Sequence, residues 1–81
     1  MWVVYFLKST SKRWYYVGST NDLERRVKQH DLGRVRSTKN HCPFLLVHTL
    51  EFGSEAEARA FERRIKKQRL LKEQIIRTIE L

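Results

Sequence analysis

The sequence predicts a small protein of the α/β (α+β) class. A three-stranded, mainly antiparallel sheet is flanked by helices, in the order β-β-α-β-α-α. Three short segments rich in β-branched and aromatic residues predict the strands. Between and after them, apolar residues recur every three to four positions, as in amphipathic helices. The chain has 81 residues, enough for one domain with a modest core, so we expect a single domain over residues 1–81.

The first two strands are predicted to form a hairpin. Residues Trp2–Lys8 are mostly apolar, aromatic or β-branched, which is typical of a strand covered on both faces. The polar residues Ser9–Lys12 follow as the turn, and Trp14–Val17 form the second strand. If the hairpin closes symmetrically about the middle of this turn, Tyr5 and Tyr16 lie directly opposite each other. Packing is the usual role of such an aromatic pair, and a shared site is the alternative.

The first helix is predicted to begin after an N-cap at Asn21. Glu24 stands three residues later, as in a capping box. The helix then runs to about His30 or Leu32 and stops near Gly33, because glycine often follows the last turn of a helix.

The second half of the chain is predicted to contain a basic loop, a strand and two helical segments. Residues Arg34–Pro43 form the loop, and Phe44–Phe52 form the third strand. Residues Ser54–Glu57 have the pattern of a full capping box, and the helix that they open continues towards Leu71. The isoleucines within Ile75–Ile79 predict a short amphipathic piece at the end.

Charge is the main global indication of function. Seventeen Lys and Arg against nine Asp and Glu give a net charge of +8, and the pI is about 10.2. Such a field attracts polyanions, so nucleic acid is the favoured partner, with an acidic membrane surface or no special partner as the alternatives.

The cellular compartment is predicted from what the sequence lacks. Cys42 is the only cysteine, which excludes an internal disulfide and favours a reducing compartment. The apolar N-terminal segment has no leading basic residues of a signal peptide, and no apolar run approaches the roughly 20 residues of a membrane span. We therefore expect a cytoplasmic protein without a membrane partner.

Polar side chains are predicted on the inward stripe of the first helix. At about 100° per residue, four residues share that stripe: Leu23, Arg26, Val27 and His30. Arg25 and Lys28 point to the opposite, solvated side. A guanidinium on an inward stripe must be paired, must bind an anion or must reach out to water from the rim. Arg26 is therefore a candidate phosphate ligand.

The second long helix has a comparable feature. Its buried arc is marked by Ala58, Phe61 and Ile65, and Glu62 lies at the rim of that arc. Lys66, one turn further on, is the natural salt-bridge partner of Glu62. The alternative role of this carboxylate is metal binding, since Mg²⁺ prefers one or two carboxylates together with phosphate oxygens.

The motifs that carry these residues resemble, in order along nearly the whole chain, the GIY-YIG nucleases, and most closely their small stand-alone bacterial members. The resemblance rests on the triads Val3–Tyr5 and Tyr16–Gly18, the segment Gly18–Arg26 followed by His30, the loop residues Gly33 and Ser37–Lys39 with the strand Pro43–Val47, and Ala58–Glu62 followed by Lys66 and Lys67. Val3 departs from the glycine of the family's first triad. No clear counterpart is seen of the Asn that some members place after the metal-binding helix.

The resemblance implies a metal-dependent DNA endonuclease, acting on structured or branched DNA in repair or recombination. Glu62 would ligate a single Mg²⁺, with Mn²⁺ as a substitute, and Arg26 would stabilise charge on the phosphate. Tyr5 and Tyr16 would position or deprotonate the attacking water, and His30 would assist proton transfer. A protein partner that supplies specificity is a further expectation.

Two other function classes remain open from the sequence. One is a non-catalytic nucleic-acid-binding or adaptor module that keeps the nuclease fold. The other is a basic protein that binds a protein partner or an acidic membrane surface. DNA cleavage separates the first class from a nuclease, because both would bind DNA through the same positive charge.

Overall fold

The computed structural model describes residues 1–80 and has the predicted order of elements. The elements are β1 (Trp2–Ser9), β2 (Tyr15–Thr20), α1 (Leu23–Asp31), β3 (Phe44–Phe52), α2 (Glu55–Lys67) and α3 (Arg69–Glu80). The sheet order is β2-β1-β3, and both outer strands run antiparallel to β1. The predicted α+β class is confirmed.

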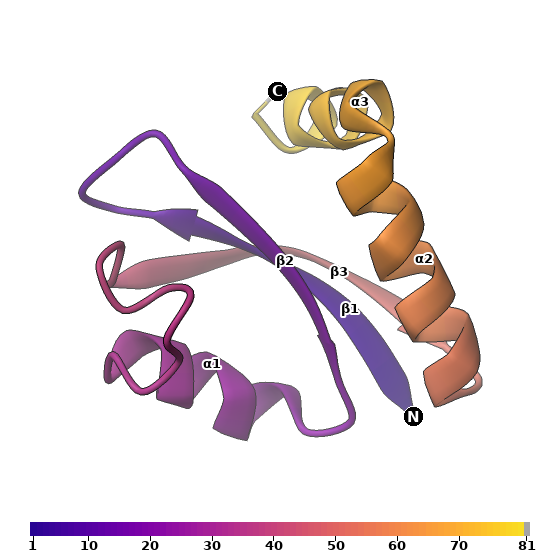
Figure 1. The fold of residues 1–81 in the computed structure, drawn as a ribbon, viewed down its shortest axis with the longest axis horizontal. Coiled ribbons are helices and arrows are strands. Elements are labelled where there is room, and N and C mark those ends of the chain that lie inside the picture. Colours follow the sequence, from indigo (N-terminus) through magenta and orange to yellow (C-terminus); the bar gives the residue numbers. More distant parts are fainter. Residues whose placement is uncertain (81) are drawn as a thin grey trace.

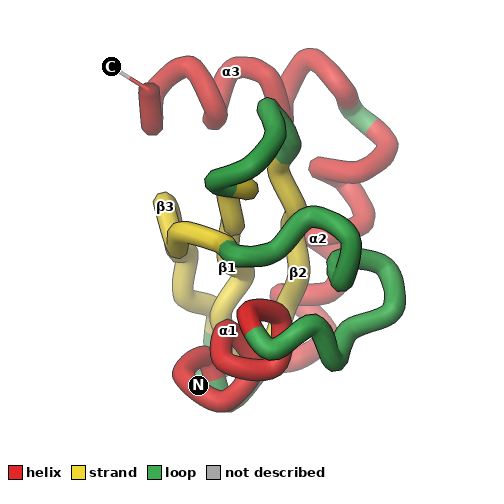
Figure 2. The backbone as a smooth tube through the Cα atoms, turned by 90° about the vertical axis from the view of Figure 1, so that its left-hand side faces the viewer, coloured by secondary structure: helices red, strands yellow, loops and turns green. Residues whose placement is uncertain are grey.

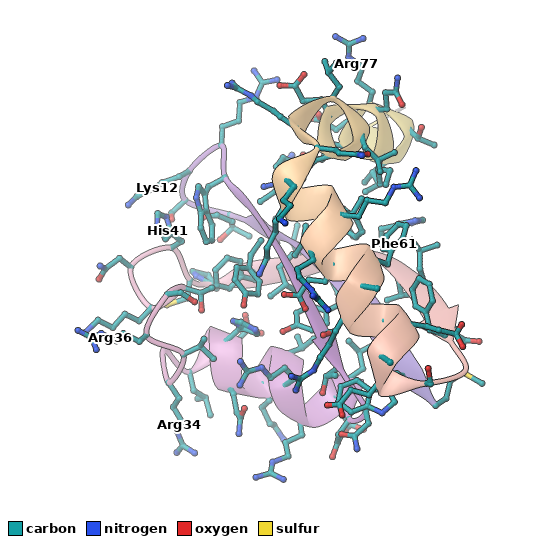
Figure 3. The ribbon with its side chains drawn as sticks, turned by 45° about the vertical axis from the view of Figure 1, so that its right-hand side comes forward. Lys12, Arg34, Arg36, His41, Phe61 and Arg77 are labelled. Carbon is teal, nitrogen blue, oxygen red and sulfur yellow. The ribbon has the colours of Figure 1, made fainter. Side chains whose placement is uncertain are left out.

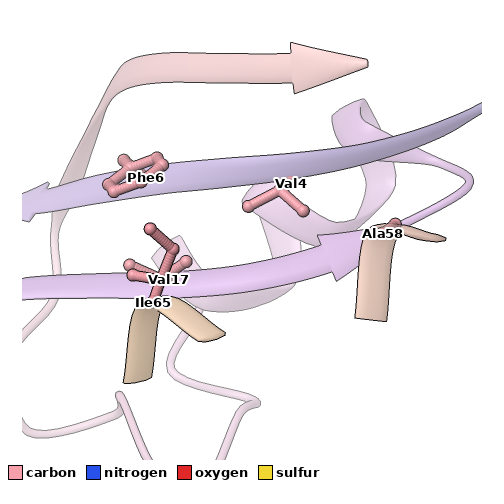
Figure 4. Close-up of a cluster of buried hydrophobic side chains, with 5 residues drawn as sticks. All are labelled: Val4, Phe6, Val17, Ala58 and Ile65. Carbon is pink, nitrogen blue, oxygen red and sulfur yellow. The ribbon is translucent and has the colours of Figure 1, made fainter. Parts of the chain in front are cut away.

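The helices cover both faces of the sheet. Figure 1 shows α1 on one side and α2 with α3 on the other. The central strand β1 is buried on both faces, because Val4 and Phe6 pack towards α2 while Tyr5 packs towards α1. Figure 4 shows the cluster on the α2 side, where Ile65 of α2 lies against Val17 of β2.

The predicted hairpin register is wrong by two residues. Tyr5 lies opposite Gly18, not opposite Tyr16. The turn is longer than a symmetrical two-residue connection: the Ser9 amide donates to the Trp14 carbonyl at 2.9 Å. The Ser9 hydroxyl oxygen also accepts two backbone N–H groups within the turn. A shift of two residues leaves each side chain on its face, so the two tyrosines remain diagonal neighbours.

The boundaries of β2 and α1 also differ from the prediction. β2 covers Tyr15–Thr20 rather than Trp14–Val17, since its later residues still pair with β1. The N-cap of α1 is Asp22, whose side chain accepts the Arg25 amide at 3.3 Å. Asn21 stands one residue too early for its side chain to cap that turn, so the capping box predicted from it is wrong.

The second long helix is interrupted earlier than predicted. The Ser54 cap is confirmed, because its hydroxyl oxygen accepts the Glu57 amide at 3.2 Å. However, α2 ends at Lys67 and the chain turns at Gln68, so the predicted continuation to Leu71 is wrong. The turn lets α3 fold back over the core on the α2 side, against which it packs Leu71, Ile75 and Ile79.

The long connection between α1 and β3, residues 32–43, lies on the same side of the sheet as α1 (Figure 2). It is tied to the hairpin by the Ser9 hydroxyl, which donates to the His41 carbonyl at 2.6 Å. The ring of His41 stacks on Trp14 with centroids 3.8 Å apart. Figure 3 shows Arg34 and Arg36 projecting outward from this loop.

Candidate active site

A pocket of about 400 Å³ opens at the edge strand β2. Because β2 lies at the edge of the sheet, side chains from α1 on one face and α2 on the other both reach it. The pocket is lined by Tyr5, Tyr16, Gly18, Ser19, Arg26, Arg59, Glu62 and Arg63. Four of the five candidate site residues predicted from the sequence therefore meet in one pocket, and the fifth, His30, lies behind Tyr5.

A buried hydrogen-bonded chain leads inward from this pocket. The Tyr5 hydroxyl lies 2.9 Å from His30 Nε2, and His30 Nδ1 lies 2.8 Å from the Thr38 hydroxyl. His30 and Thr38 are both fully buried, and Tyr5 is 1% exposed. Their polar groups therefore satisfy one another rather than water, as buried polar groups must.

Burial keeps the two titratable side chains of this hydrogen-bonded row, Tyr5 and His30, neutral near pH 7. It raises the pKa of Tyr5 to about 12, although Arg26 opposes the rise by favouring the phenolate. It lowers the pKa of His30 to about 4, and the positive charge of Arg26 adds to that effect. The Tyr5 phenol and the His30 imidazole thus form a neutral pair in the free protein.

Tyr16 completes the aromatic wall of the pocket. Its ring centroid lies 6.3 Å from that of Tyr5 and 5.0 Å from that of His30. On the α2 side, Lys66 Nζ lies 5.5 Å from the centre of the Tyr16 ring. Tyr16, at the edge of the sheet, therefore contacts side chains from both the α1 side and the α2 side.

Arg26 occupies the inward stripe of α1, as predicted. It is half-buried, whereas Arg25 and Lys28 are exposed. Its guanidinium donates to the Gln29 amide oxygen at 3.1 Å. Within residues 1–80 it forms no salt bridge with a carboxylate. A half-buried cation without a carboxylate partner is suited to binding an anion that enters the pocket.

Each oxygen of the Glu62 carboxylate accepts one hydrogen bond. Lys66 donates to one carboxylate oxygen at 2.7 Å, as the salt-bridge interpretation predicts. The Ser19 hydroxyl donates to the other oxygen at 2.6 Å. The Glu62 side chain is still 21% exposed, so it remains open to the pocket.

The oxygen ligands at Glu62 fit a hard cation such as Mg²⁺. Magnesium is commonly held by one or two carboxylates, with waters and substrate phosphate as the remaining ligands. Over residues 1–80 no group of three or more His, Cys, Asp or Glu side chains is arranged to hold a metal. Glu62, with the hydroxyl of Ser19 beside it, would therefore supply the protein's share of an open site.

Several residues of the site were missed by sequence reasoning. Gly18 faces Tyr5 so closely that an added Cβ would lie 2.5 Å from the Tyr5 hydroxyl oxygen. Ser19 and Thr38 reach the site through the hairpin register and the path of the loop; both lie in segments that carry the family resemblance, but neither was assigned a role in the site. Arg59 and Arg63 line the pocket with Glu62. Arg59 precedes Glu62 by three residues on α2, a spacing that places two side chains on the same side of a helix and could have indicated it.

Comparisons with known proteins agree with the sequence motifs. A family model described as the GIY-YIG catalytic domain matches residues 1–74. A UPF0213 protein of Nitratidesulfovibrio vulgaris is 41% identical over 69 residues, which make up 84% of this chain and 62% of that relative. The chain thus spans less than two thirds of the length of that relative. A UPF0213 protein of Halalkalibacterium halodurans is 39% identical over 75 residues, covering 90% of this chain and 79% of the relative.

A solved structure supports the same assignment of fold. The solution NMR structure of a UPF0213 protein from Bacillus halodurans aligns with a TM-score of 0.59 at 36% sequence identity. The alignment covers 96% of this chain and 85% of that chain.

In the part of the chain that the structure describes, no helix has the length and apolar character to cross a membrane.

Proposed function

Because the chain belongs to the GIY-YIG nuclease family, we propose that it is a metal-dependent DNA endonuclease that hydrolyses phosphodiester bonds. One arrangement supports this proposal: the half-buried guanidinium of Arg26, which has no carboxylate partner among residues 1–80, shares a pocket with the accessible carboxylate of Glu62 and with the hydroxyl of the buried Tyr5–His30 pair. The net charge of +8 would draw DNA towards this pocket. Structured or branched DNA is the proposed substrate.

The phosphate would be held mainly by arginines. Arg26 enters the pocket from α1, and Arg59 and Arg63 enter from α2. Arg59 is already paired with Glu55 at 2.9 Å, so Arg26 and Arg63 are the more available cations. A guanidinium can contact two phosphate oxygens at once, which orients the phosphate as well as attracting it. Arg26 is the proposed group that stabilises the charge developing on the phosphate.

Glu62 would hold the metal ion, and Ser19 would keep its carboxylate turned towards the pocket through the 2.6 Å hydrogen bond. When bound there, Mg²⁺ or Mn²⁺ would stabilise negative charge on the phosphate oxygens and make a bound water more acidic. Lys66 would have to leave or share the carboxylate, and the phosphate itself is a suitable new partner for its ammonium group.

The Tyr5–His30 pair would accept the proton that the attacking water loses. Hydrolysis forms a bond from the water oxygen to phosphorus and breaks one phosphorus–oxygen ester bond. The water must lose a proton, and the leaving oxygen takes the electron pair of the broken bond and would take up a proton from solvent. The Tyr5 hydroxyl would accept that proton while passing its own to His30 Nε2, 2.9 Å away. The negative phosphate offsets the positive charge that then resides on His30. Tyr16 would help to position the water from the opposite wall.

A metal and mutation series tests this proposal. Plasmid, linear and branched DNA are incubated with the protein and Mg²⁺, Mn²⁺ or EDTA. We expect cleavage with either metal and none with EDTA. Glu62→Gln should abolish cleavage with little change in folding or DNA binding, since it removes one charge and little volume. Glu73→Gln is the matched control, because Glu73 also pairs with a cation one turn away but lies outside the pocket.

The second candidate function is non-catalytic DNA binding by the same fold. The 2.7 Å contact between Lys66 and Glu62 favours it, because a salt bridge of this kind can be purely structural. DNA binding without cleavage under every metal condition, or unfolding of Glu62→Gln, would support this candidate.

For either function we propose a single domain, a cytoplasmic location and a protein partner that adds specificity.

A further inference from the structure

The loop between α1 and β3 contributes one fully buried side chain to the site. Thr38 is 0% exposed, while Ser37 and Lys39 on either side of it are exposed. An unpartnered hydroxyl in such a place would destabilise the fold. The Thr38 hydroxyl avoids this cost through two contacts, with His30 Nδ1 at 2.8 Å and with the Val35 carbonyl oxygen at 3.4 Å.

Two arrangements of the hydrogen bonds fit these groups. The Thr38 hydroxyl has one proton, which it can donate to the Val35 carbonyl oxygen or to His30 Nδ1. If it donates to Val35, the Thr38 oxygen accepts the proton carried by His30 Nδ1. A neutral imidazole has one protonated nitrogen, and the hydrogen bond at one nitrogen determines the state of the other. In this first arrangement His30 Nε2 is an acceptor that faces the Tyr5 hydroxyl.

We propose that Thr38 is a positioning residue that fixes the tautomer and orientation of His30, so that Nε2 can receive the proton of Tyr5. This inference rests on the proposed nuclease function for its catalytic consequence, but not for its structural content. Thr38 also links the site to the outer loop, where the exposed Arg34, Arg36 and Lys39 are suited to phosphate contacts. Displacement of this loop would therefore change the hydrogen bond between Thr38 and His30.

Removal of the hydroxyl should reverse the tautomer. In Thr38→Val, the Nδ1 proton would lose its acceptor in a dry environment, which is unfavourable. The proton would move to Nε2 and donate to Tyr5, whose own hydroxyl would turn towards the pocket and could no longer pass a proton inward. We expect kcat for DNA cleavage to fall about tenfold to a hundredfold, as for other groups that orient a functional histidine, with KM changed less than twofold.

The test uses the whole chain labelled with ¹⁵N and records the ring nitrogens of His30 by NMR at pH 7. We expect protonation at Nδ1 in the wild type and at Nε2 in Thr38→Val, with the signals of His41 and His48 unchanged as internal references. Thr38→Ser keeps the hydroxyl and should retain both the wild-type tautomer and a kcat within a few-fold. Ser37→Ala, which alters the exposed neighbour, is the matched control.

Each outcome decides the inference. A wild-type His30 protonated at Nε2, an unchanged tautomer in Thr38→Val, or a loss of kcat in Thr38→Ser equal to that in Thr38→Val would overturn it. If Thr38→Val does not fold, Thr38→Cys takes its place, because a thiol is a much weaker acceptor of similar size. If the wild type cleaves no DNA, the proposed function fails while the NMR result still decides the role of Thr38.

Discussion

Gly18 provides the sharpest test of how the fold builds the pocket. A Cβ at this position would lie 2.5 Å from the Tyr5 hydroxyl oxygen, 2.6 Å from Tyr5 Cζ and 2.9 Å from Tyr16 Cε2. Real Cβ atoms do not approach other atoms so closely, so Gly18→Ala must displace both tyrosines. Tyr5 cannot move inward, because it is buried and held by His30.

The expected magnitude follows from this crowding. Overpacking of a well-packed interior usually destabilises a protein by about 1–3 kcal/mol, and each kcal/mol lowers Tm by roughly 4–8 °C in a domain of this size. A displacement of catalytic groups by about 1 Å can reduce the rate on the order of 100-fold. We therefore expect Gly18→Ala to lose both stability and cleavage, with the rate falling even where the protein is fully folded.

Gly53→Ala is the matched control for this substitution. A Cβ at Gly53 would meet only the flexible end of Glu57, at 3.8 Å. Tm should therefore change little, and the cleavage rate should stay within a few-fold of the wild type. Thermal unfolding followed by circular dichroism and a plasmid-nicking assay measure the two effects. If Gly18→Ala matched Gly53→Ala in both, the close approach of Gly18 and Tyr5 would not be what shapes the site.

Three further predictions follow from the charged groups. Arg26→Ala should reduce cleavage on the order of 100-fold and Arg25→Ala only a few-fold, since Arg26 is half-buried at the pocket and Arg25 is exposed; equal losses in a nicking assay at one salt concentration would contradict the role of Arg26. DNA affinity measured by fluorescence anisotropy should fall steeply as salt is raised, and binding that ignores salt would argue against phosphate contacts. Burial lowers the pKa of His30 in the folded protein from 6.5 to about 4, so the unfolded chain binds more protons between these two pH values. The free energy of unfolding should therefore fall as pH is lowered through this window, by on the order of 3 kcal/mol in total. In urea titrations at several pH values, His30→Gln should lack this part of the pH dependence.

Helical phase explains why the polar site residues could be predicted from the sequence. Arg26 and His30 share a stripe with apolar residues, and a helix keeps that relation whatever the tertiary structure. The same holds for Glu62 beside Phe61 and Ile65 on α2. Periodicity therefore predicted which polar groups turn inward, although not what they would contact.

Tertiary geometry explains why other features could not be predicted. The strand register depends on the turn, and the side chain of Ser9 allowed a longer turn than a symmetrical hairpin. Periodicity alone did not place the end of α2, because the benefit of folding α3 back over the core lies in contacts distant along the chain. Thr38 lies in an irregular loop, where no period exists to distinguish the one buried hydroxyl from its exposed neighbours.

The position of the site at an edge strand links stability to chemistry in this small protein. Tyr5 and His30 occupy places on the α1 side of the sheet that apolar residues would fill more stably, and the site uses their burial to keep the pair neutral. A chain of 81 residues has little core to offset such polar groups. The chain of contacts from Tyr5 through His30 to Thr38 reduces that penalty, because each buried polar group satisfies the next. The same hydrogen bonds that satisfy the buried histidine are therefore the ones that we propose fix its tautomer, with the unprotonated nitrogen facing Tyr5.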